Sequence, residues 1–101
     1  MAQFDVYENQ NPRTNEEIPY LLDIQNNILK NLQTRVVVPL VLNMKPANIL
    51  NQQFEINDLT VTMSTAELAG ISLEHLGSLV CSVESKRDEI ISAVDFMITG
   101  F

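Results

Sequence analysis

Segments in which hydrophobic and polar residues alternate predict β-strands near the start of the chain. In residues 3–7 (QFDVY), Phe4 and Val6 fall on one side of a strand, and Tyr7 falls on the other side with polar neighbours. This is the period of a half-buried strand. Residues 9–17 (NQNPRTNEE) are polar and have no periodicity, which predicts a mobile loop.

Two more hydrophobic segments predict the next strands. Residues 18–25 (IPYLLDIQ) predict a strand with Pro19 at its start. Residues 35–42 (RVVVPLVL) form an almost continuous β-branched run, and such a run predicts a strand that is buried on both faces. Because proline has no backbone N–H to donate, Pro39 predicts a bulge or an edge position within this strand.

The middle of the chain contains one hairpin signal and one segment without a clear pattern. Residues 54–56 (FEI) and 59–63 (LTVTM) flank Asn57 and Asp58, and a two-residue spacing of this type predicts a β-hairpin. Residues 64–83 contain two glycines that interrupt any long helix. The pattern assigns no element to this segment.

The end of the chain has the period of a helix. Ser85, followed three residues later by Asp88, resembles a capping box at its start, although the usual third residue is Glu or Gln. On a helical wheel, Phe96 projects from the polar side. One broad apolar stripe contains Ile90, Ile91, Ala93, Val94, Met97 and Ile98, and the opposite side contains Asp88, Ser92 and Asp95.

Several short strands followed by one helix predict a mainly antiparallel α+β domain that is barrel-like. The 101 residues, 46% of them hydrophobic, predict one domain over residues 1–101 with a single modest core. No apolar run reaches the roughly 20 residues of a membrane span. The start of the chain shows no export signal, and the lone Cys81 suits a reducing compartment. We therefore expect a cytoplasmic protein.

The charge balance bears on the partners of the protein. Six Lys and Arg residues against 13 Asp and Glu residues give a formal net charge of −7. Such a surface repels phosphate backbones and anionic lipids, which disfavours nucleic-acid and membrane binding. Protein partners with basic surfaces are favoured.

No pattern of catalytic residues stands out. His75 is the single histidine, so one chain cannot assemble a Ser-His-Asp triad or a site with several histidines. Glu16-Glu17 and Asp88-Glu89 are adjacent carboxylates, which point apart on a strand or helix and so favour solvated charge over a hydrolase pair. We expect neither a metal nor a cofactor, and no enzymatic activity.

The terminal residues raise a separate question, because the chain ends on a bare aromatic. Gly100 suits the left-handed residue that closes a helix. Phe101 then either folds back over Phe96, a contact common in such caps, or stays partly exposed as part of a binding surface. The spacing leaves both interpretations open, and the two are compatible.

Several strings in the sequence together resemble the CcdB family of toxins. They are MAQFDVY, LLDIQNNIL, TRVVVPL, MSTAELAGI and RDEIISAVDFMITGF, in that order along nearly the whole chain. No single string is specific. Their co-occurrence is the signal, together with a helix that ends in Gly and one apolar residue.

The resemblance implies an SH3-like barrel with a small extra sheet and a C-terminal helix, assembled as a homodimer. It implies that the toxin binds the DNA gyrase A subunit, traps gyrase on cleaved DNA, and is neutralised by a CcdA-like antitoxin. Gyrase binding is then expected at Thr99, Gly100 and Phe101, with Ile98, Asp95 and Ile28 on the same surface. Antitoxin contacts are expected at Tyr7, Glu8, Asp23 and Gln25, with residues 41–50 nearby.

The chain departs from the family pattern in ways that keep alternatives open. Thr99 stands where the best-known pattern has Trp, so a ring that could stack on a guanidinium is missing. The loop over residues 9–17 is longer than in that pattern, and the segment after Leu40 is shorter. The leading hypothesis is a gyrase poison. The alternatives are an RNA-cleaving toxin of the MazF kind, against which the net charge argues, and an inactive relative that binds only an antitoxin.

Overall fold

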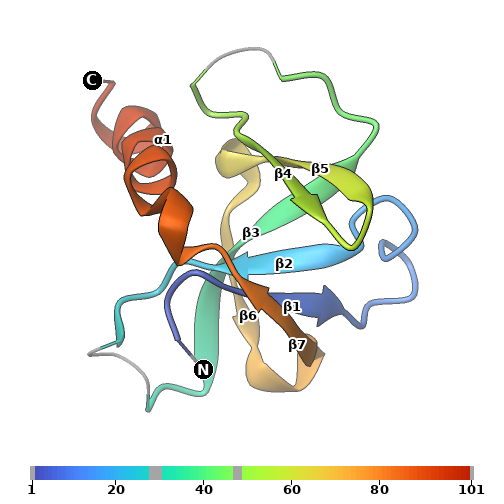
Figure 1. The fold of residues 1–101 in the computed structure, drawn as a ribbon. Coiled ribbons are helices and arrows are strands. Elements are labelled where there is room, and N and C mark those ends of the chain that lie inside the picture. Colours follow the sequence, from blue (N-terminus) through green and yellow to red (C-terminus); the bar gives the residue numbers. More distant parts are fainter. Residues whose placement is uncertain (1, 28–30, 47–48, 101) are drawn as a thin grey trace.

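The computed structural model describes residues 2–27, 31–46 and 49–100, and strands predominate in this part of the chain (Figure 1). The strands are β1 (Asp5–Asn9), β2 (Tyr20–Asp23), β3 (Thr34–Leu42), β4 (Gln53–Ile56), β5 (Leu59–Met63), β6 (Ala69–Ser72) and β7 (Leu76–Ser82). The helix is α1 (Arg87–Thr99).

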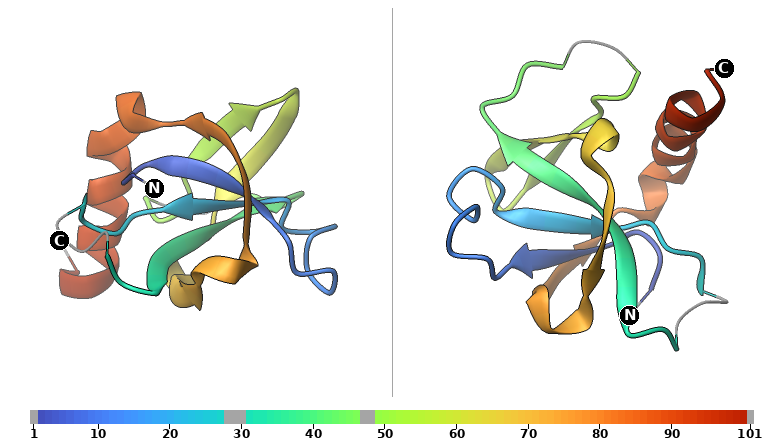
Figure 2. Two further views of the ribbon diagram at one scale, coloured as in Figure 1. Left: turned by 90° about the horizontal axis from the view of Figure 1, so that it is seen from below. Right: turned by 180° about the vertical axis from the view of Figure 1, so that it is seen from behind.

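The strands form one antiparallel sheet in the order β4-β5-β3-β2-β1-β7, and β6 pairs with the first half of β3. Because β6 lies beside β3 and β7 beside β1, the short 3-10 turn Leu73–His75 connects the two edges of β1–β2–β3. The sheet is therefore curled into a half-barrel with α1 beside it (Figure 2). The predicted class, a mainly antiparallel α+β fold with a C-terminal helix, is confirmed. The β4–β5 hairpin continues the main sheet through the pairing of β5 with β3.

One face of the sheet packs against α1, and we call it the helix face. Val6, Leu22 and Val38 lie on it and are completely buried. From α1, Ile90 and Ala93 join the same cluster. Together with the β4–β5 hairpin, these side chains form the larger hydrophobic core, and their burial is the main favourable contribution to folding.

The opposite face, which we call the polar face, is covered by the segment from β6 to β7. Tyr7 and Leu21 pair across β1 and β2 on this face, Val37 pairs with Asp23, and the three apolar side chains pack against Leu76. Tyr7 was predicted on the polar side of a half-buried strand, but its side chain is buried. That prediction was wrong because the sheet curls and its second face is also covered. The register places Asp23 and Arg35 on this same face.

In the long strand β3, Pro39 occupies a local edge position, because no strand pairs with it on one side. On one side Pro39 pairs with Leu21 of β2 without a bulge. On the other side β3 changes partner, from β6 at residues 34–37 to β5 at residues 40–42. Pro39 lies in the gap between the two partners, where its carbonyl accepts a hydrogen bond from the Ser64 N–H. Its missing N–H therefore costs no sheet hydrogen bond.

The hairpin prediction and the strand predictions hold with small shifts in their bounds. Asn57 and Asp58 have φ of 51° and 66°, so both central residues of the β4–β5 turn are left-handed, as in the turns that match strand twist. β3 lies at its predicted place, whereas β1 begins and ends two residues later than predicted. Phe4 precedes β1 with φ of 72° and is buried against the helix face.

The predicted start of the helix was wrong. A 3-10 turn, Glu84–Lys86, precedes α1, and the N-cap residue Lys86 makes no side-chain capping hydrogen bond. Ser85 therefore lies inside that turn, not at the cap. Asp88 and Glu89 lie in the first turn of α1, where a negative charge is stabilised by the helix dipole.

The predicted apolar stripe of α1 faces the sheet only along the first half of the helix. Ile90 and Ala93 are buried, Ile91, Val94 and Met97 are partly buried, and Ile98 is exposed. The helix thus extends beyond the sheet that it covers, as Figure 1 shows. Among the described residues, no helix is long and apolar enough to cross a membrane.

Candidate functional site

The last turn of α1 is closed by a left-handed glycine. Gly100 has φ of 80° and ψ of 14°, and its N–H donates to the Phe96 carbonyl at 2.8 Å. The predicted cap is confirmed. One residue earlier in the chain, the Thr99 hydroxyl donates to the Asp95 carbonyl at 2.7 Å. These two hydrogen bonds satisfy carbonyls that a frayed helix end would leave to water.

This helix end exposes apolar side chains to solvent. Ile98 is 70% exposed and Phe96 is 37% exposed. The neighbouring residues Asp95, Thr99 and Gly100 are exposed as well. Of the residues expected to bind gyrase, these four (Asp95, Ile98, Thr99 and Gly100) therefore lie together on an accessible surface. Ile28 and Phe101 lie outside the described residues.

The residues expected to contact an antitoxin have different environments. Glu8 is exposed on β1. Tyr7, Asp23 and Gln25 are buried beneath the surface of the polar face. The structure therefore separates Glu8, which a partner can reach directly, from three buried side chains. Glu8 pairs with Tyr20 on the helix-face side of the sheet, whereas Tyr7 and Asp23 lie on the polar face.

Asp23 and Arg35 form a buried ion pair in the polar face. The Arg35 Nη2 lies 2.7 Å from Asp23 Oδ2, the Arg35 Nε donates to the same oxygen at 2.8 Å, and both side chains are fully buried. The other carboxylate oxygen accepts the Gln25 backbone N–H at 2.9 Å. Burial raises the pKa of Asp23, and the Gln25 N–H and the Arg35 guanidinium oppose that rise. The Arg35 Nη1 has no hydrogen-bond partner among the described residues.

Tyr7 lies near the Asp23 carboxylate but donates its hydrogen bond to a different one. Its hydroxyl donates to Asp5 Oδ2 at 3.3 Å. Burial raises the pKa of the Tyr7 phenol, and the negative charges of Asp5 and Asp23 raise it further. Tyr7 therefore stays neutral and acts as a hydrogen-bond donor. The arrangement stabilises the sheet and presents no exposed acid or base.

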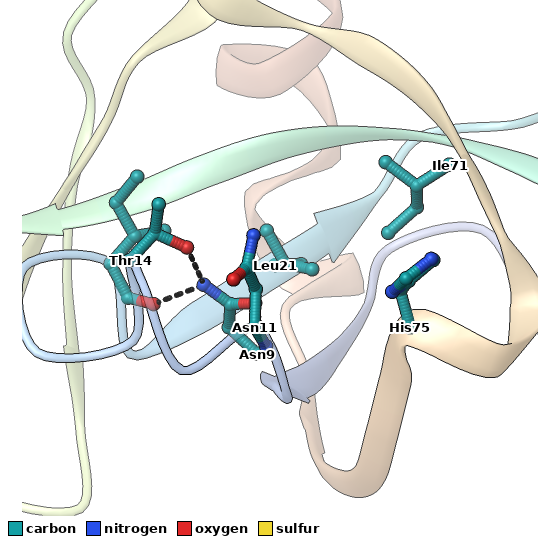
Figure 3. A pocket seen from close by; sticks show the side chains of 7 residues that line it. Asn9, Asn11, Thr14, Leu21, Ile71 and His75 are labelled. Atoms are coloured by element: carbon teal, nitrogen blue, oxygen red, sulfur yellow. Dashed lines mark hydrogen bonds between the residues drawn. The ribbon is translucent and has the colours of Figure 1, made fainter.

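A pocket of about 310 Å³ opens at the other end of the polar face (Figure 3). Its lining combines three aliphatic side chains with four polar ones: Asn9, Asn11, Thr14, Ile18, Leu21, Ile71 and His75. In Figure 3, Asn9, Asn11 and Thr14 lie on one side, Ile71 and His75 lie on the other, and Leu21 lies between them. The β1–β2 loop and the β6–β7 turn therefore build its two walls.

The loop that forms one wall has ordered turns. The Asn9 Nδ2 donates to Thr14 Oγ1 at 3.0 Å and to the Ile18 carbonyl at 2.8 Å, while its Oδ1 accepts the Asn11 N–H. The Asn15 N–H donates to the Asn11 carbonyl at 2.9 Å. A loop over residues 9–17 was predicted in the right place, but these hydrogen bonds give it a defined conformation that polar composition alone does not reveal.

Two features of the site were not recognised from the sequence. The single charge within each of two hydrophobic strands, Asp23 in one and Arg35 in the next, was a signal for a buried pair, because a lone buried charge needs a partner. His75, the single histidine of the sequence, lies in an exposed turn and lines the pocket. Nothing local in the sequence indicated that the turn at His75 would approach the loop after Asn9. Within the described ranges, no three His, Cys, Asp or Glu side chains group as metal ligands would.

Comparison with solved structures finds the same fold in two endoribonucleases and a MazF toxin. An endoribonuclease in complex with its cognate antitoxin, from a mycobacterial species, aligns with a TM-score of 0.79 at 15% identity, covering 97% of this chain and 94% of that one. A second mycobacterial endoribonuclease gives 0.78 at 15% identity, covering 97% and 90%. The Mycobacterium tuberculosis toxin MazF-mt6 gives 0.77 at 11% identity, covering 93% and 95%. At these identities the similarity establishes the fold.

Sequence comparison assigns the chain to a family. No curated protein sequence matches it significantly. A family model does match, and it spans residues 3–100 under the description CcdB protein. That range includes every described element, from β1 to the last turn of α1. The chain therefore belongs to the CcdB family of toxin–antitoxin toxins.

Proposed function

We propose that this protein is a gyrase poison, which binds the DNA gyrase A subunit and holds gyrase on cleaved DNA. The observation that carries the proposal is the last turn of α1, where Ile98 is exposed beside Phe96 and Gly100 closes the helix. Family membership supports it. The protein would act in the cytoplasm by binding alone, with no cofactor or metal.

The physical basis of this action is a rigid apolar contact. Two hydrogen bonds hold the end of α1, to the Phe96 and Asp95 carbonyls, so little conformational freedom is lost when a partner covers it. Apolar anchors near the centre of an interface cost about 2 kcal/mol or more when truncated. Thr99 replaces a large ring with a small side chain, so this surface offers gyrase less area than the family pattern does.

A second copy of the chain completes this proposal. In a homodimer related by a two-fold axis, the same patch occurs twice, and a symmetric partner such as the gyrase dimer would meet both copies. The partly exposed Phe96 is then a dimer contact or part of the gyrase surface. Sedimentation equilibrium tests the dimer directly, and a monomer at micromolar concentration contradicts it.

The antitoxin part of the proposal concerns β1 and the residues around it. A CcdA-like antitoxin would contact Glu8 directly, because that side chain is exposed on β1. Tyr7, Asp23 and Gln25, being buried, would support this surface without touching the antitoxin. A basic antitoxin segment is favoured by the net charge of −7.

The test is a supercoiling and DNA-cleavage assay with purified gyrases from more than one bacterium. We expect the chain to inhibit supercoiling and to accumulate cleaved DNA. Ile98→Asp, or deletion of residues 99–101, should abolish both effects. Leu79→Asp is the matched control, since Leu79 is 60% exposed but lies on β7. Activity that is absent with every gyrase, or unchanged by Ile98→Asp and by the deletion, overturns the proposal.

The similarity to endoribonucleases supports a second candidate, a toxin that cleaves RNA on the same fold. The charge and the buried network argue against it. RNA would meet a surface of net charge −7, and Arg35, the most central cation, is fully buried and ion-paired. Incubation with single-stranded RNA decides the matter, because sequence-specific cleavage would establish the second candidate.

A further inference from the structure

We propose that the pocket between the β1–β2 loop and the β6–β7 turn binds one aliphatic side chain of an extended, basic segment of the antitoxin. The identity of this partner rests on the proposed function above. The inference adds a specific binding subsite and the chemistry of its occupant. It places the main antitoxin contact in this pocket and not at the buried residues Asp23 and Gln25.

The lining of the pocket selects an aliphatic group. Its apolar part consists of Ile18, Leu21 and Ile71, and its polar part of Asn9, Asn11, Thr14 and His75. At about 310 Å³, it lies at the lower end of the range for ligand pockets. An aliphatic side chain can fill the apolar part while the peptide backbone beside it meets the amides, the hydroxyl and the imidazole.

The pocket is formed before any partner binds. Asn9 holds its loop through hydrogen bonds to Thr14, to the Ile18 carbonyl and from the Asn11 N–H. The Glu17 carbonyl also accepts the Leu42 N–H at 2.8 Å, which ties the loop to the end of β3. An occupant therefore does not have to order this wall, and more of its contact energy appears as affinity.

The charges around the pocket select a basic occupant. Four exposed acidic residues lie within two positions of a lining residue in the sequence: Glu8, Glu16, Glu17 and Glu74. Glu8 also lies beside β7, because its Cβ and carbonyl are the atoms nearest to Gly77. Arg13 is the one Lys or Arg in the two segments that build the walls, residues 8–18 and 71–77. Lysines or arginines that flank an aliphatic anchor would complement these carboxylates.

The same charges decide between a protein and an RNA occupant. Nucleic-acid sites neutralise phosphates with Lys and Arg, and this rim carries carboxylates instead. The exposed residues Glu17 and Glu74 directly adjoin the lining residues Ile18 and His75 in sequence. A basic peptide is therefore favoured over RNA at this pocket.

The chain provides its own reporter for a binding experiment. His75 is the only histidine in the sequence and lines the pocket, so its imidazole NMR signals need no mutation to be assigned. The probes are two peptides of equal length with flanking lysines, one with a central Leu and the other with a central Ser. We expect the Leu peptide to shift the His75 signals and the Ile18, Leu21 and Ile71 methyl signals at concentrations about tenfold lower than the Ser peptide. Glutamate in place of the flanking lysines should abolish the shifts.

Variants on the two surfaces separate this inference from the gyrase proposal. Ile71→Glu places a charge in the pocket, and Asn11→Phe obstructs the rim at an exposed position where misfolding is not expected. Both should weaken Leu-peptide binding at least tenfold while inhibition of gyrase persists. Leu59→Glu is the matched control, because this exposed residue begins β5, which contributes nothing to the pocket.

The outcomes are distinguishable. Equal binding of the Leu and Ser peptides, or a Leu-peptide affinity unchanged in Asn11→Phe, overturns the inference and leaves the gyrase proposal standing. Preferential binding of the Leu peptide without inhibition of any gyrase supports the inference and overturns the gyrase proposal. Shifts of the same signals by a single-stranded RNA oligonucleotide, in the absence of peptide effects, would assign the pocket to RNA and also overturn the inference.

Discussion

The two faces of the sheet bury neighbouring residues in chemically different ways. Leu22 and Asp23 are adjacent in β2, point to opposite faces, and are both fully buried. Leu22 packs among apolar side chains on the helix face, where contact with any well-fitting neighbour is favourable. Asp23 requires one specific partner, the Arg35 guanidinium 2.7 Å away. Leu22 and Asp23 are therefore equally buried for different reasons. Leu22 is stabilised by non-directional apolar packing, and Asp23 is stabilised by one specific ion pair.

This difference also distributes the functional surfaces. The helix face is closed by α1, and only the end of that helix extends beyond it and exposes Ile98. The polar face combines the buried ion pair at one end with the open pocket at the other. On the polar face, where the buried charges are paired, loops can shape the surface. The apolar side chains of the helix face must instead be covered so that water is excluded.

The largest effect is expected from breaking the ion pair on one side only. Asp23→Leu leaves the Arg35 guanidinium buried without its carboxylate, and uncompensated buried charges cost about 3–5 kcal/mol. Urea denaturation followed by circular dichroism should show this loss in the free energy of unfolding. Arg35→Met should have a comparable effect, because Asp23 is then the isolated charge.

The double variant sharpens this prediction. Asp23→Leu combined with Arg35→Met removes both charges, so most of the lost stability should return. The recovery stays incomplete because the Gln25 N–H loses its acceptor on Asp23. If the double variant is as unstable as the sum of the two single variants, the ion pair is not the reason for their instability.

The matching change on the helix face should behave differently. Leu22→Ala creates a cavity in the larger core, with an expected loss of about 2–4 kcal/mol. No single substitution of a partner should restore this loss, since many side chains share the contact. Leu22→Met, which nearly conserves volume, should cost less than about 1.5 kcal/mol. The same denaturation curves measure both, and a Leu22→Met variant as unstable as Leu22→Ala contradicts the interpretation.

A smaller effect is expected where β7 meets β1 beside the pocket. A Cβ added at Gly77 would lie 2.9 Å from both the Cβ and the carbonyl oxygen of Glu8. Backbone must therefore shift in Gly77→Ala, at a cost of about 1–3 kcal/mol. Gly70→Ala is the control, because nothing lies within 4 Å of the added Cβ there. Hydrogen exchange of β1 and β7 amides measures the shift, and equal exchange in the two variants would contradict it.

The sequence predicted the helix face better than the polar face, for a physical reason. Alternation reports apolar burial, so Phe4 and Val6 were placed correctly together on one buried side of the first strand. Tyr7 was misplaced because alternation does not reveal that a curled sheet is covered twice. The cap at Gly100 was predicted from the local pattern, but the exposure of Ile98 was not, because the helical wheel placed it on the apolar stripe. The pocket was not, since it depends on a turn at His75 meeting a loop that begins more than sixty residues earlier.

The smallest effect that we predict concerns Cys81, which packs at the margin of the helix face and is affected by the negative charge of Asp5. Burial raises the pKa of the Cys81 thiol, and the negative charge of Asp5 raises it further. At any given pH the folded protein then holds less reactive thiolate than an exposed cysteine does. Alkylation by iodoacetamide should therefore accelerate at a higher pH in the folded protein than in the protein unfolded by urea.

Asp5→Asn separates the two causes of this pKa shift. The substitution removes the charge and leaves the burial in place, so the pH midpoint of alkylation should fall only part of the way toward that of the unfolded chain. A midpoint that falls all the way would mean that charge dominates and that the margin of the helix face is open to water. A folded midpoint equal to the unfolded one from the outset would show that Cys81 is not packed against the helix face, and the comparison between the two faces would not extend to this edge of the sheet.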